Sequence, residues 1–251
     1  MPWVETQSLS FSARHDSRHV EHATRVLEAL EEQREELAER FERTPGEVAV
    51  VIHPRPLALA LAHPWLPLAR LTAAPASRRY FAGWFTAQEI HVLAPPALER
   101  RASRVEGSRE ALLRSPQHEY AHLVVGANNP ELPPPFSVAS FRRYVRRAWL
   151  CEGAATWFSG QTPLLRGAVA RRLREGPRPA FPPAARDAQL LGGTLFDLLA
   201  REQGPEAVVE LTATTEADGD RAALATAFRR QSAEVERAWR RHLERFAAAD
   251  S

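Results

Sequence analysis

Apolar and polar residues alternate near the start of the chain and then change to a helical spacing. The alternation over residues 9–14 has the period of two that predicts a half-buried strand. Asp16 or Ser17 can cap the next helix, which the apolar spacing places at residues 18–43. Residues 47–53 are rich in β-branched side chains and predict a strand buried on both faces. The chain is therefore expected to begin as a β-α-β unit.

Shorter elements are predicted in the section that follows. Residues 56–63 favour a short helix and residues 64–76 a loop, because prolines interrupt that run. Two further strands are expected at residues 79–85 and 88–93, joined by a tight connection and stopped by two prolines. These strands would complete a small mixed sheet.

The last third of the chain has only helical periodicity. Apolar stripes and breaks such as Gly-Pro predict helices, the last of them capped by Ser232, at residues 163–175, 184–203, 205–213, 221–230 and 233–247. The predicted fold class is α+β. We expect an N-terminal α+β part over residues 1–126 and a helical C-terminal part over residues 127–251.

Composition argues against several classes of function and indicates the cellular compartment. The 33 basic residues are all arginine and are nearly balanced by 31 acidic residues, so we expect no basic groove and no nucleic-acid partner. Cys151 is the only cysteine, which rules out an intrachain disulfide. The N-terminus lacks the features of a signal peptide, and no apolar run reaches the length of a membrane span. A cytoplasmic protein with no membrane partner is expected.

The segment from His118 to His122 reads H-E-x-x-H. Residues four apart lie on one face of a helix, so His118 and His122 can both reach one Zn²⁺ ion. Glu119 can then hold the proton of a water bound to that ion, an arrangement typical of a zinc hydrolase. The motif is short enough to occur by chance, so the interpretation needs a third ligand.

The helix that contains this motif has to accommodate Pro116. Ser115 as N-cap with Pro116 at the first helical position is one solution, and a kinked helix that starts near Ser108 is another. We expect Gly126 to end the helix, before a proline-rich loop at residues 127–135.

Glu152 is the candidate for the third ligand. It lies in an apolar segment, residues 149–158, that predicts a helix antiparallel to the motif helix. Gly153 and Ala154 are small enough to let the two helices approach closely. A carboxylate in such surroundings is costly unless a cation or a metal ion meets it.

The two segments HEYAH and AWLCEGAATWF resemble the motifs of the gluzincin metallopeptidases, most closely the peptidase MA-like group with its W-L-x-E-G-x-A pattern. The resemblance is tight at these motifs and loose over the rest of residues 9–246. It implies a zincin-like fold with one Zn²⁺ ion held by His118, His122 and Glu152. It also implies Glu119 as the general base in the hydrolysis of peptide bonds.

The resemblance also concerns the substrate. The segment QEIHVLAP, residues 88–95, resembles the edge strand along which a peptide or protein substrate of this group is expected to lie by strand addition. One position departs from the family pattern: members commonly have an oxyanion-stabilising tyrosine where this chain has Leu190, which cannot donate a hydrogen bond. Gln189, Tyr144 or His91 could replace it, and the sequence does not choose among them.

Two other functions stay open at this stage. A peptidase-like scaffold that binds zinc or a peptide with weak or no turnover would explain the missing tyrosine, although the presence of Glu119 argues for catalysis. An arginine-rich interaction module at residues 141–147 is the other. Thr156, one turn after Glu152, is either an orienting partner of a ligand or an ordinary helix threonine.

Overall fold

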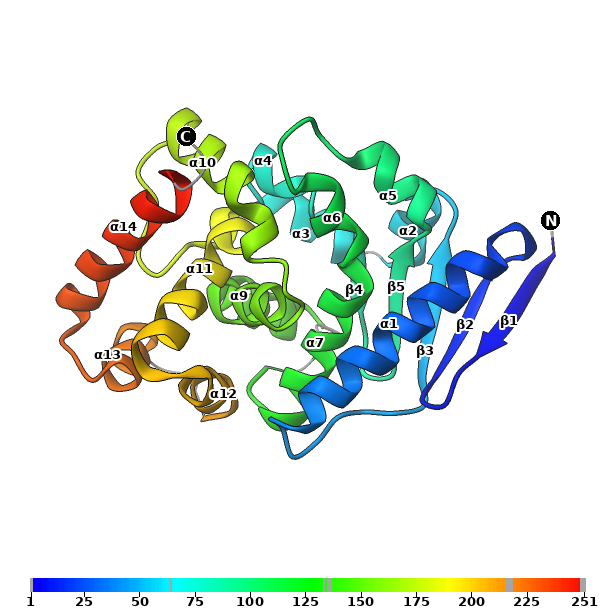
Figure 1. Ribbon diagram of the computed structural model, residues 1–251, viewed down its shortest axis with the longest axis horizontal. Coiled ribbons are helices and arrows are strands. Elements are labelled where there is room, and N and C mark those ends of the chain that lie inside the picture. Colours follow the sequence, from blue (N-terminus) through cyan, green and yellow to red (C-terminus); the bar gives the residue numbers. More distant parts are fainter. Residues whose placement is uncertain (1, 64, 133, 135–136, 215–218, 249–251) are drawn as a thin grey trace.

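The fold is α+β, with a five-stranded mixed sheet beside a helical C-terminal part (Figure 1). The computed structural model describes residues 2–63, 65–132, 134, 137–214 and 219–248. Across the sheet the strand order is β1-β2-β3-β5-β4, with β2, β3 and β5 parallel and the two edge strands antiparallel to their neighbours. The strands are β1 (Trp3–Gln7), β2 (Phe11–Asp16), β3 (Val48–His53), β4 (Gly83–Phe85) and β5 (Glu89–Leu93).

Helices make up most of the remaining chain, and all the helices predicted in the C-terminal part are present. In chain order they are α1 (Val20–Ala38), α2 (Pro56–Ala62), α3 (Trp65–Thr72), α4 (Pro75–Arg78), α5 (Pro95–Arg101), α6 (Ser108–Leu113), α7 (Ser115–Asn128), α8 (Val138–Arg146), α9 (Ala148–Phe158), α10 (Arg166–Glu175), α11 (Ala185–Gln203), α12 (Pro205–Thr214), α13 (Asp220–Phe228) and α14 (Ser232–Ala248). Single 3-10 turns precede α1 and α10.

The predicted β-α-β unit is confirmed as β2-α1-β3, with one strand added before it. The pattern missed β1 because that strand has no fully buried residue, so its side chains follow no apolar alternation. Asp16 caps the 3-10 turn (Ser17–His19) that leads into α1, since its carboxylate accepts a hydrogen bond from the backbone N–H of Arg18 at 3.0 Å, whereas α1 itself has no side-chain cap. α1 ends at Ala38, earlier than expected, and Phe41 beyond it packs its ring 5.0 Å from that of Phe158.

The loop predicted at residues 64–76 is wrong in its described part, which forms α3 and α4. Proline does not prevent these helices because Pro67 lies in the first turn of α3 and Pro75 starts α4, where no backbone N–H is needed. Position 64 lies outside the described residues. Ser232 does not cap α14 as predicted: its hydroxyl oxygen has no hydrogen-bond partner among the described residues.

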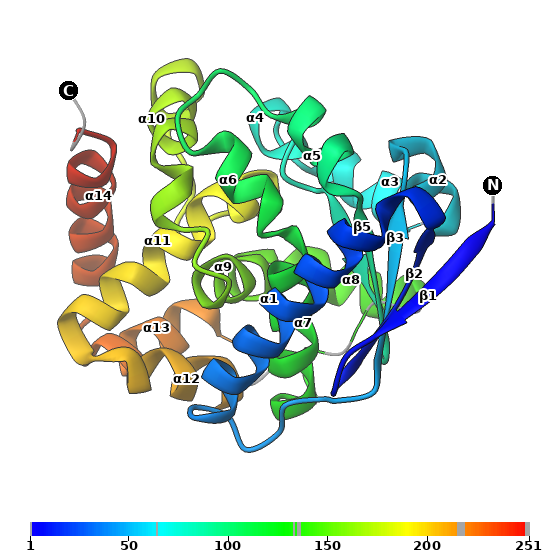
Figure 2. The ribbon, with the colours of Figure 1, turned by 45° about the vertical axis from the view of Figure 1, so that its right-hand side comes forward.

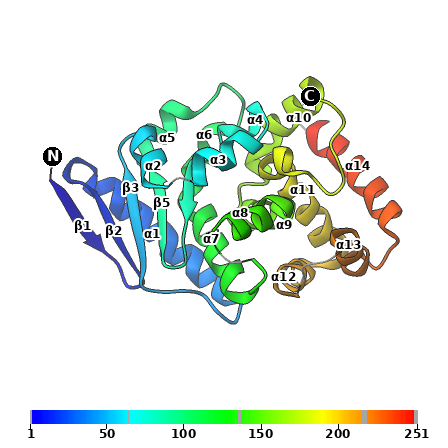
Figure 3. The ribbon, with the colours of Figure 1, turned by 180° about the vertical axis from the view of Figure 1, so that it is seen from behind.

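Helices cover both faces of the sheet. α1 and α7 pack on one face, where α1 contacts β2 and α7 contacts β4 and β5, and α2 contacts β3 and β5 from the other side. Figures 1 and 3, seen from opposite sides, show α1 in front of the strands in one view and α2 in front of them in the other. The end of the sheet formed by β4 is thus next to α7, the helix that contains the H-E-x-x-H motif.

Helix α9 is the centre of the helical part, enclosed between α7 and α11 (Figure 2). The close approach expected at Gly153 is real, but its partner is α11 and not the motif helix. A Cβ at Gly153 would lie 2.8 Å from the carbonyl carbon of Gly192, so the two backbones touch at a pair of glycines. This contact fixes the distance between α9 and α11 and so helps to fix the position of Glu152 in the core.

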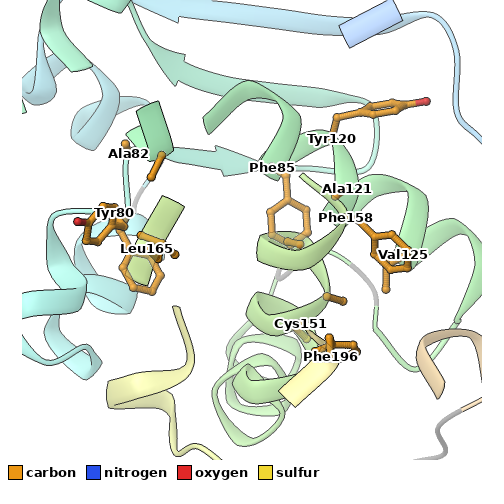
Figure 4. Packing of buried hydrophobic residues seen from close by; sticks show 14 of the residues in the cluster. Tyr80, Ala82, Phe85, Tyr120, Ala121, Val125, Cys151, Phe158, Leu165 and Phe196 are labelled. Atoms are coloured by element: carbon orange, nitrogen blue, oxygen red, sulfur yellow. The ribbon is translucent and has the colours of Figure 1, made fainter. Parts of the chain in front are cut away.

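One hydrophobic cluster joins the sheet to the helical part. Figure 4 shows Phe85 of β4, Val125 of α7, Cys151 of α9 and Phe196 of α11 within it. Because the site residues come from the same elements, the packing of this cluster also sets their positions. No helix in the described ranges is both long and apolar enough to cross a membrane.

Candidate metal centre

The motif helix α7 begins after a one-residue interruption of the helix at Arg114. α6 ends at Leu113 and α7 starts at Ser115, so neither alternative is exact: the helix that starts at Ser108 is interrupted, Arg114 is the N-cap of α7, and Pro116 lies in its first turn. The Ser115 hydroxyl does not cap α7 but donates to the carbonyl oxygen of Leu112 at 2.6 Å. Gly126 does not end the helix either, since α7 continues to Asn128.

Three side chains from α7 and α9 bring their ligand atoms together inside the protein. The Nε2 atoms of His118 and His122 are 3.1 Å apart. Glu152 places one carboxylate oxygen 3.3 Å from Nε2 of His118 and the other 3.5 Å from Nε2 of His122. Among the described residues this is the one group of three or more such side chains that could hold a metal ion, and all three are buried.

The spacing of these atoms fits a small tetrahedral ion. Zn²⁺ binds His nitrogen and carboxylate oxygen at about 2.0–2.1 Å, so two ligands of a regular tetrahedron lie about 3.3–3.4 Å apart. The separation of the two Nε2 atoms, 3.1 Å, and the two N–O separations, 3.3 and 3.5 Å to different oxygens of Glu152, lie near that value. Oε2 of Glu152 and Nδ1 of His118 also have no hydrogen-bond partner among the described residues. A buried carboxylate oxygen left without a donor is what a cation would satisfy.

The imidazole of His122 is prepared for a metal by its surroundings. Burial lowers the pKa of His122 to about 3, so the ring is neutral and its nitrogen lone pair is available. The ring stacks on Phe85 of β4 with centroids 4.2 Å apart and planes 10° from parallel. The edge strand therefore fixes the orientation of this ligand.

Glu119 points from α7 toward the same edge strand. A Cβ built on Gly83 of β4 would lie 2.6 Å from Cγ of Glu119, so the glycine makes the room that this carboxyl group occupies. Burial, and then the negative charge of Glu152, raise the pKa of Glu119 well above its usual value. Gly83 was not predicted as a site residue, although a glycine that starts a short strand is a signal of close approach.

Tyr144, on α8, is the direct neighbour of the third candidate ligand. Its hydroxyl donates a hydrogen bond to Oε1 of Glu152. Burial and the Glu152 charge raise the pKa of Tyr144, so the phenol keeps its proton and acts as a donor. α8 itself is held at its start by a capping box between Ser137 and Ser140.

The structure separates the three candidates for the oxyanion donor. Tyr144 and Gln189 line a small pocket together with His118, Glu119 and Glu152. His91 is not among the residues that line it. Its ring faces His53 at 3.0 Å on one side and the Glu89 carboxylate at 3.3 Å on the other.

The prediction that residues 88–95 form an edge strand is wrong. Residues 88–95 contain β5, which lies between β3 and β4, and the edge beside the site is β4. The expectation came from the resemblance of the segment QEIHVLAP to the edge strand of the peptidase MA-like group, whereas β4 has only three residues, all of them buried. Strand order depends on pairing across the sheet, which no local pattern records.

Thr156 and residues 141–147, which the sequence also singled out, both contribute to packing inside the protein. The Thr156 hydroxyl has no hydrogen-bond partner among the described residues, so it does not orient a ligand; its methyl side packs toward Gly193 of α11. Residues 141–147 fall mainly on α8, where Phe141 stacks on Trp65 with ring centroids 5.1 Å apart. The aromatic residues of that segment therefore pack within the protein.

Comparison with known proteins adds no assignment. No protein-family model, no curated protein and no solved structure matches this chain. The geometry of the site is therefore the basis for a function.

Proposed function

We propose that the protein is a zinc-dependent metallopeptidase that hydrolyses peptide bonds, with His118, His122 and Glu152 as ligands of one Zn²⁺ ion and Glu119 as general base. The observation that supports this most directly is that the Nε2 atoms of His118 and His122 are 3.1 Å apart and lie 3.3 and 3.5 Å from the carboxylate oxygens of Glu152, with Glu119 lining the same small pocket. A site that only holds a metal for stability would need no further carboxyl group at this point.

Each residue has a separate part in the proposed reaction. A bound Zn²⁺ ion would supply Lewis acidity, which lowers the pKa of a bound water to about 7 and polarises a carbonyl group. Glu119 accepts the proton of the attacking water and passes it to the leaving amine. Tyr144 keeps Glu152 in place through its hydrogen bond.

The oxyanion donor and the substrate position follow from the same pocket. The Tyr144 proton is engaged by Glu152, so Gln189 is the residue that we propose for the oxyanion. We place the substrate chain along β4, because β4 is the edge strand and its residues Gly83 and Phe85 contact Glu119 and His122.

Two measurements on one pair of variants test the proposal. Zinc content by elemental analysis should be one ion per chain for the wild type and for Glu119→Gln. Cleavage of a peptide library or of unfolded casein should fall about 10²–10⁴-fold in Glu119→Gln, the usual contribution of a general base. Glu110→Gln, an exposed carboxylate on α6, is the matched control and should cleave like the wild type.

A zinc-binding protein with weak or no turnover is the second candidate function. It is favoured by the closure of the site, where Glu119 is 6% and Glu152 2% exposed, and by Leu190 at the position of the family tyrosine. Zinc bound at one ion per chain without cleavage that depends on Glu119 would establish this candidate and refute the peptidase. Absence of zinc binding would refute both.

A further inference from the structure

Two short helices on the outer side of the sheet expose leucines to solvent. On α2, Leu57 and Leu61 are 69% and 77% exposed, and they lie on one face because they are four residues apart. On α3, Leu68 and Leu71 are 42% and 69% exposed and are three residues apart. The other exposed large apolar side chains in the described residues are Trp3, Leu9, Val20 and Val138, of which the first three lie near the N-terminus.

These helices are apolar on both of their sides. Leu59 of α2 and Leu66 and Ala69 of α3 are completely buried against the rest of the protein. A surface helix normally has charged or polar residues on the side opposite its buried stripe. Here leucines take those positions, so the exposed side needs an apolar partner to cover it.

The same region lacks negative charge. No Asp or Glu occurs in residues 48–88 or in residues 132–151, and each of these segments has four arginines. The first segment contains α2 and α3, and the second contains α8. Of the acidic residues that border these segments, Glu89 pairs with Arg14, Glu131 lies 3.8 Å from Arg143, and Glu152 is buried at the metal centre. A partner of this region should therefore be negatively charged as well as apolar.

Helices α3 and α8 form one continuous surface. They contact each other, and the rings of Trp65 and Phe141 stack 5.1 Å apart at their junction. Figure 3 shows α2, α3 and α8 on the side of the molecule that faces the viewer. On the outer side of α8, Val138 is 58% exposed and Arg142, four residues later on the same stripe, is also exposed.

We propose that this face, made of the exposed sides of α2, α3 and α8, binds the surface of an anionic lipid membrane. The leucines would enter the boundary between headgroups and acyl chains, and the arginines would contact lipid phosphates. An anionic bilayer supplies both of the required properties over an extended area. This binding is peripheral, involves no membrane-spanning helix and does not depend on the metal site.

Flotation with vesicles tests the proposal. The full-length protein is mixed with vesicles of phosphatidylcholine alone or of equimolar phosphatidylcholine and phosphatidylglycerol, and the bound fraction is measured at low and at high salt. We expect binding to the anionic vesicles that weakens at high salt, and little binding to phosphatidylcholine. In the variant with Leu57, Leu61, Leu68 and Leu71 changed to Gln, binding should fall at least a hundredfold, since burial of one leucine is worth about tenfold or more.

Leu9→Gln is the matched control. Leu9 is 93% exposed but lies between β1 and β2, outside the proposed face, so this variant should bind like the wild type. Circular dichroism and thermal unfolding check that both variants fold; the substituted leucines are exposed, so both should. A second test is the double variant Arg142→Gln with Arg146→Gln. Its binding to the anionic vesicles should be weaker than that of the wild type, and its binding to phosphatidylcholine vesicles should be unchanged.

Three results would overturn the proposal. The first is a wild-type protein that stays unbound with both kinds of vesicle. The second is equal flotation of the wild type and the four-leucine variant. The third is a wild-type dimer, seen by light scattering, that the four-leucine substitution converts to a monomer without any effect on vesicles, because the face would then join two copies of the chain.

Discussion

Replacing Gly153 with alanine tests whether the contact between α9 and α11 positions Glu152. The added Cβ would lie 2.6 Å from a ring carbon of Phe196 and 2.8 Å from the carbonyl carbon of Gly192. Comfortable carbon–carbon contacts are about 3.5–4.0 Å. The Phe196 ring could turn away, but the Gly192 backbone cannot, so α9 and α11 must separate by roughly 1 Å at this point.

The expected loss of stability is the difference between two effects. Overpacking a well-filled core costs about 1–3 kcal/mol. Alanine in place of glycine inside a helix stabilises the folded state by about 1 kcal/mol, because alanine has the higher helix propensity. The added Cβ meets backbone atoms, which cannot move aside as a side chain can. We therefore expect overpacking to be the larger effect, with a net decrease in the free energy of unfolding of about 1–2 kcal/mol. For a chain of this size that lowers Tm by about 2–8 °C.

The same displacement should weaken metal binding. Glu152 is adjacent to Gly153, so a shift of α9 moves its carboxylate relative to His118 and His122, and we expect zinc affinity to fall about tenfold or more. Thermal unfolding of the metal-free protein measures the first effect, and competition with a chelator measures the second. Gly46→Ala is the control, because its Cβ would have no neighbour closer than 3.8 Å. A Gly153→Ala protein with wild-type Tm and zinc affinity would refute the reasoning.

The remaining predictions concern metal affinity, catalysis and acid stability. Glu152→Gln should lower zinc affinity by more than Tyr144→Phe, which removes only the hydrogen bond to that carboxylate; equal affinities in a chelator competition would contradict the assignment. Gly83→Ala should displace Glu119 and reduce peptide cleavage at least tenfold with one zinc ion still bound, and unchanged cleavage in a single-turnover assay would show that the two residues do not touch. Burial lowers the pKa of His53 from 6.5 to about 4, so the unfolded state takes up a proton first and stability falls as the pH drops from 6.5 toward 4. His53→Gln should reduce that fall in urea unfolding at pH 7 and pH 5, and an equally steep loss in the variant would exclude His53 as a cause.

Local periodicity was sufficient for most of the elements. The β2-α1-β3 unit and the C-terminal helices could be predicted because apolar spacing repeats every two or every 3.6 residues within a single segment. The relation of His118 to His122 is local in the same way, since any helix places residues four apart on one face. Errors arose where local signals conflict, as at Pro67 and Pro75, which look like breaks but lie in first turns of helices.

By itself, then, the sequence determined the α+β class, most of the helices and the shared face of the two histidines. Only the tertiary structure decided which segments became neighbours. It brought Glu152 to the histidines, gave Gly153 a partner in α11, and made β4 rather than β5 the edge strand. These are contacts between residues far apart in the chain, and they depend on how whole elements pack and pair, which no pattern within one segment contains.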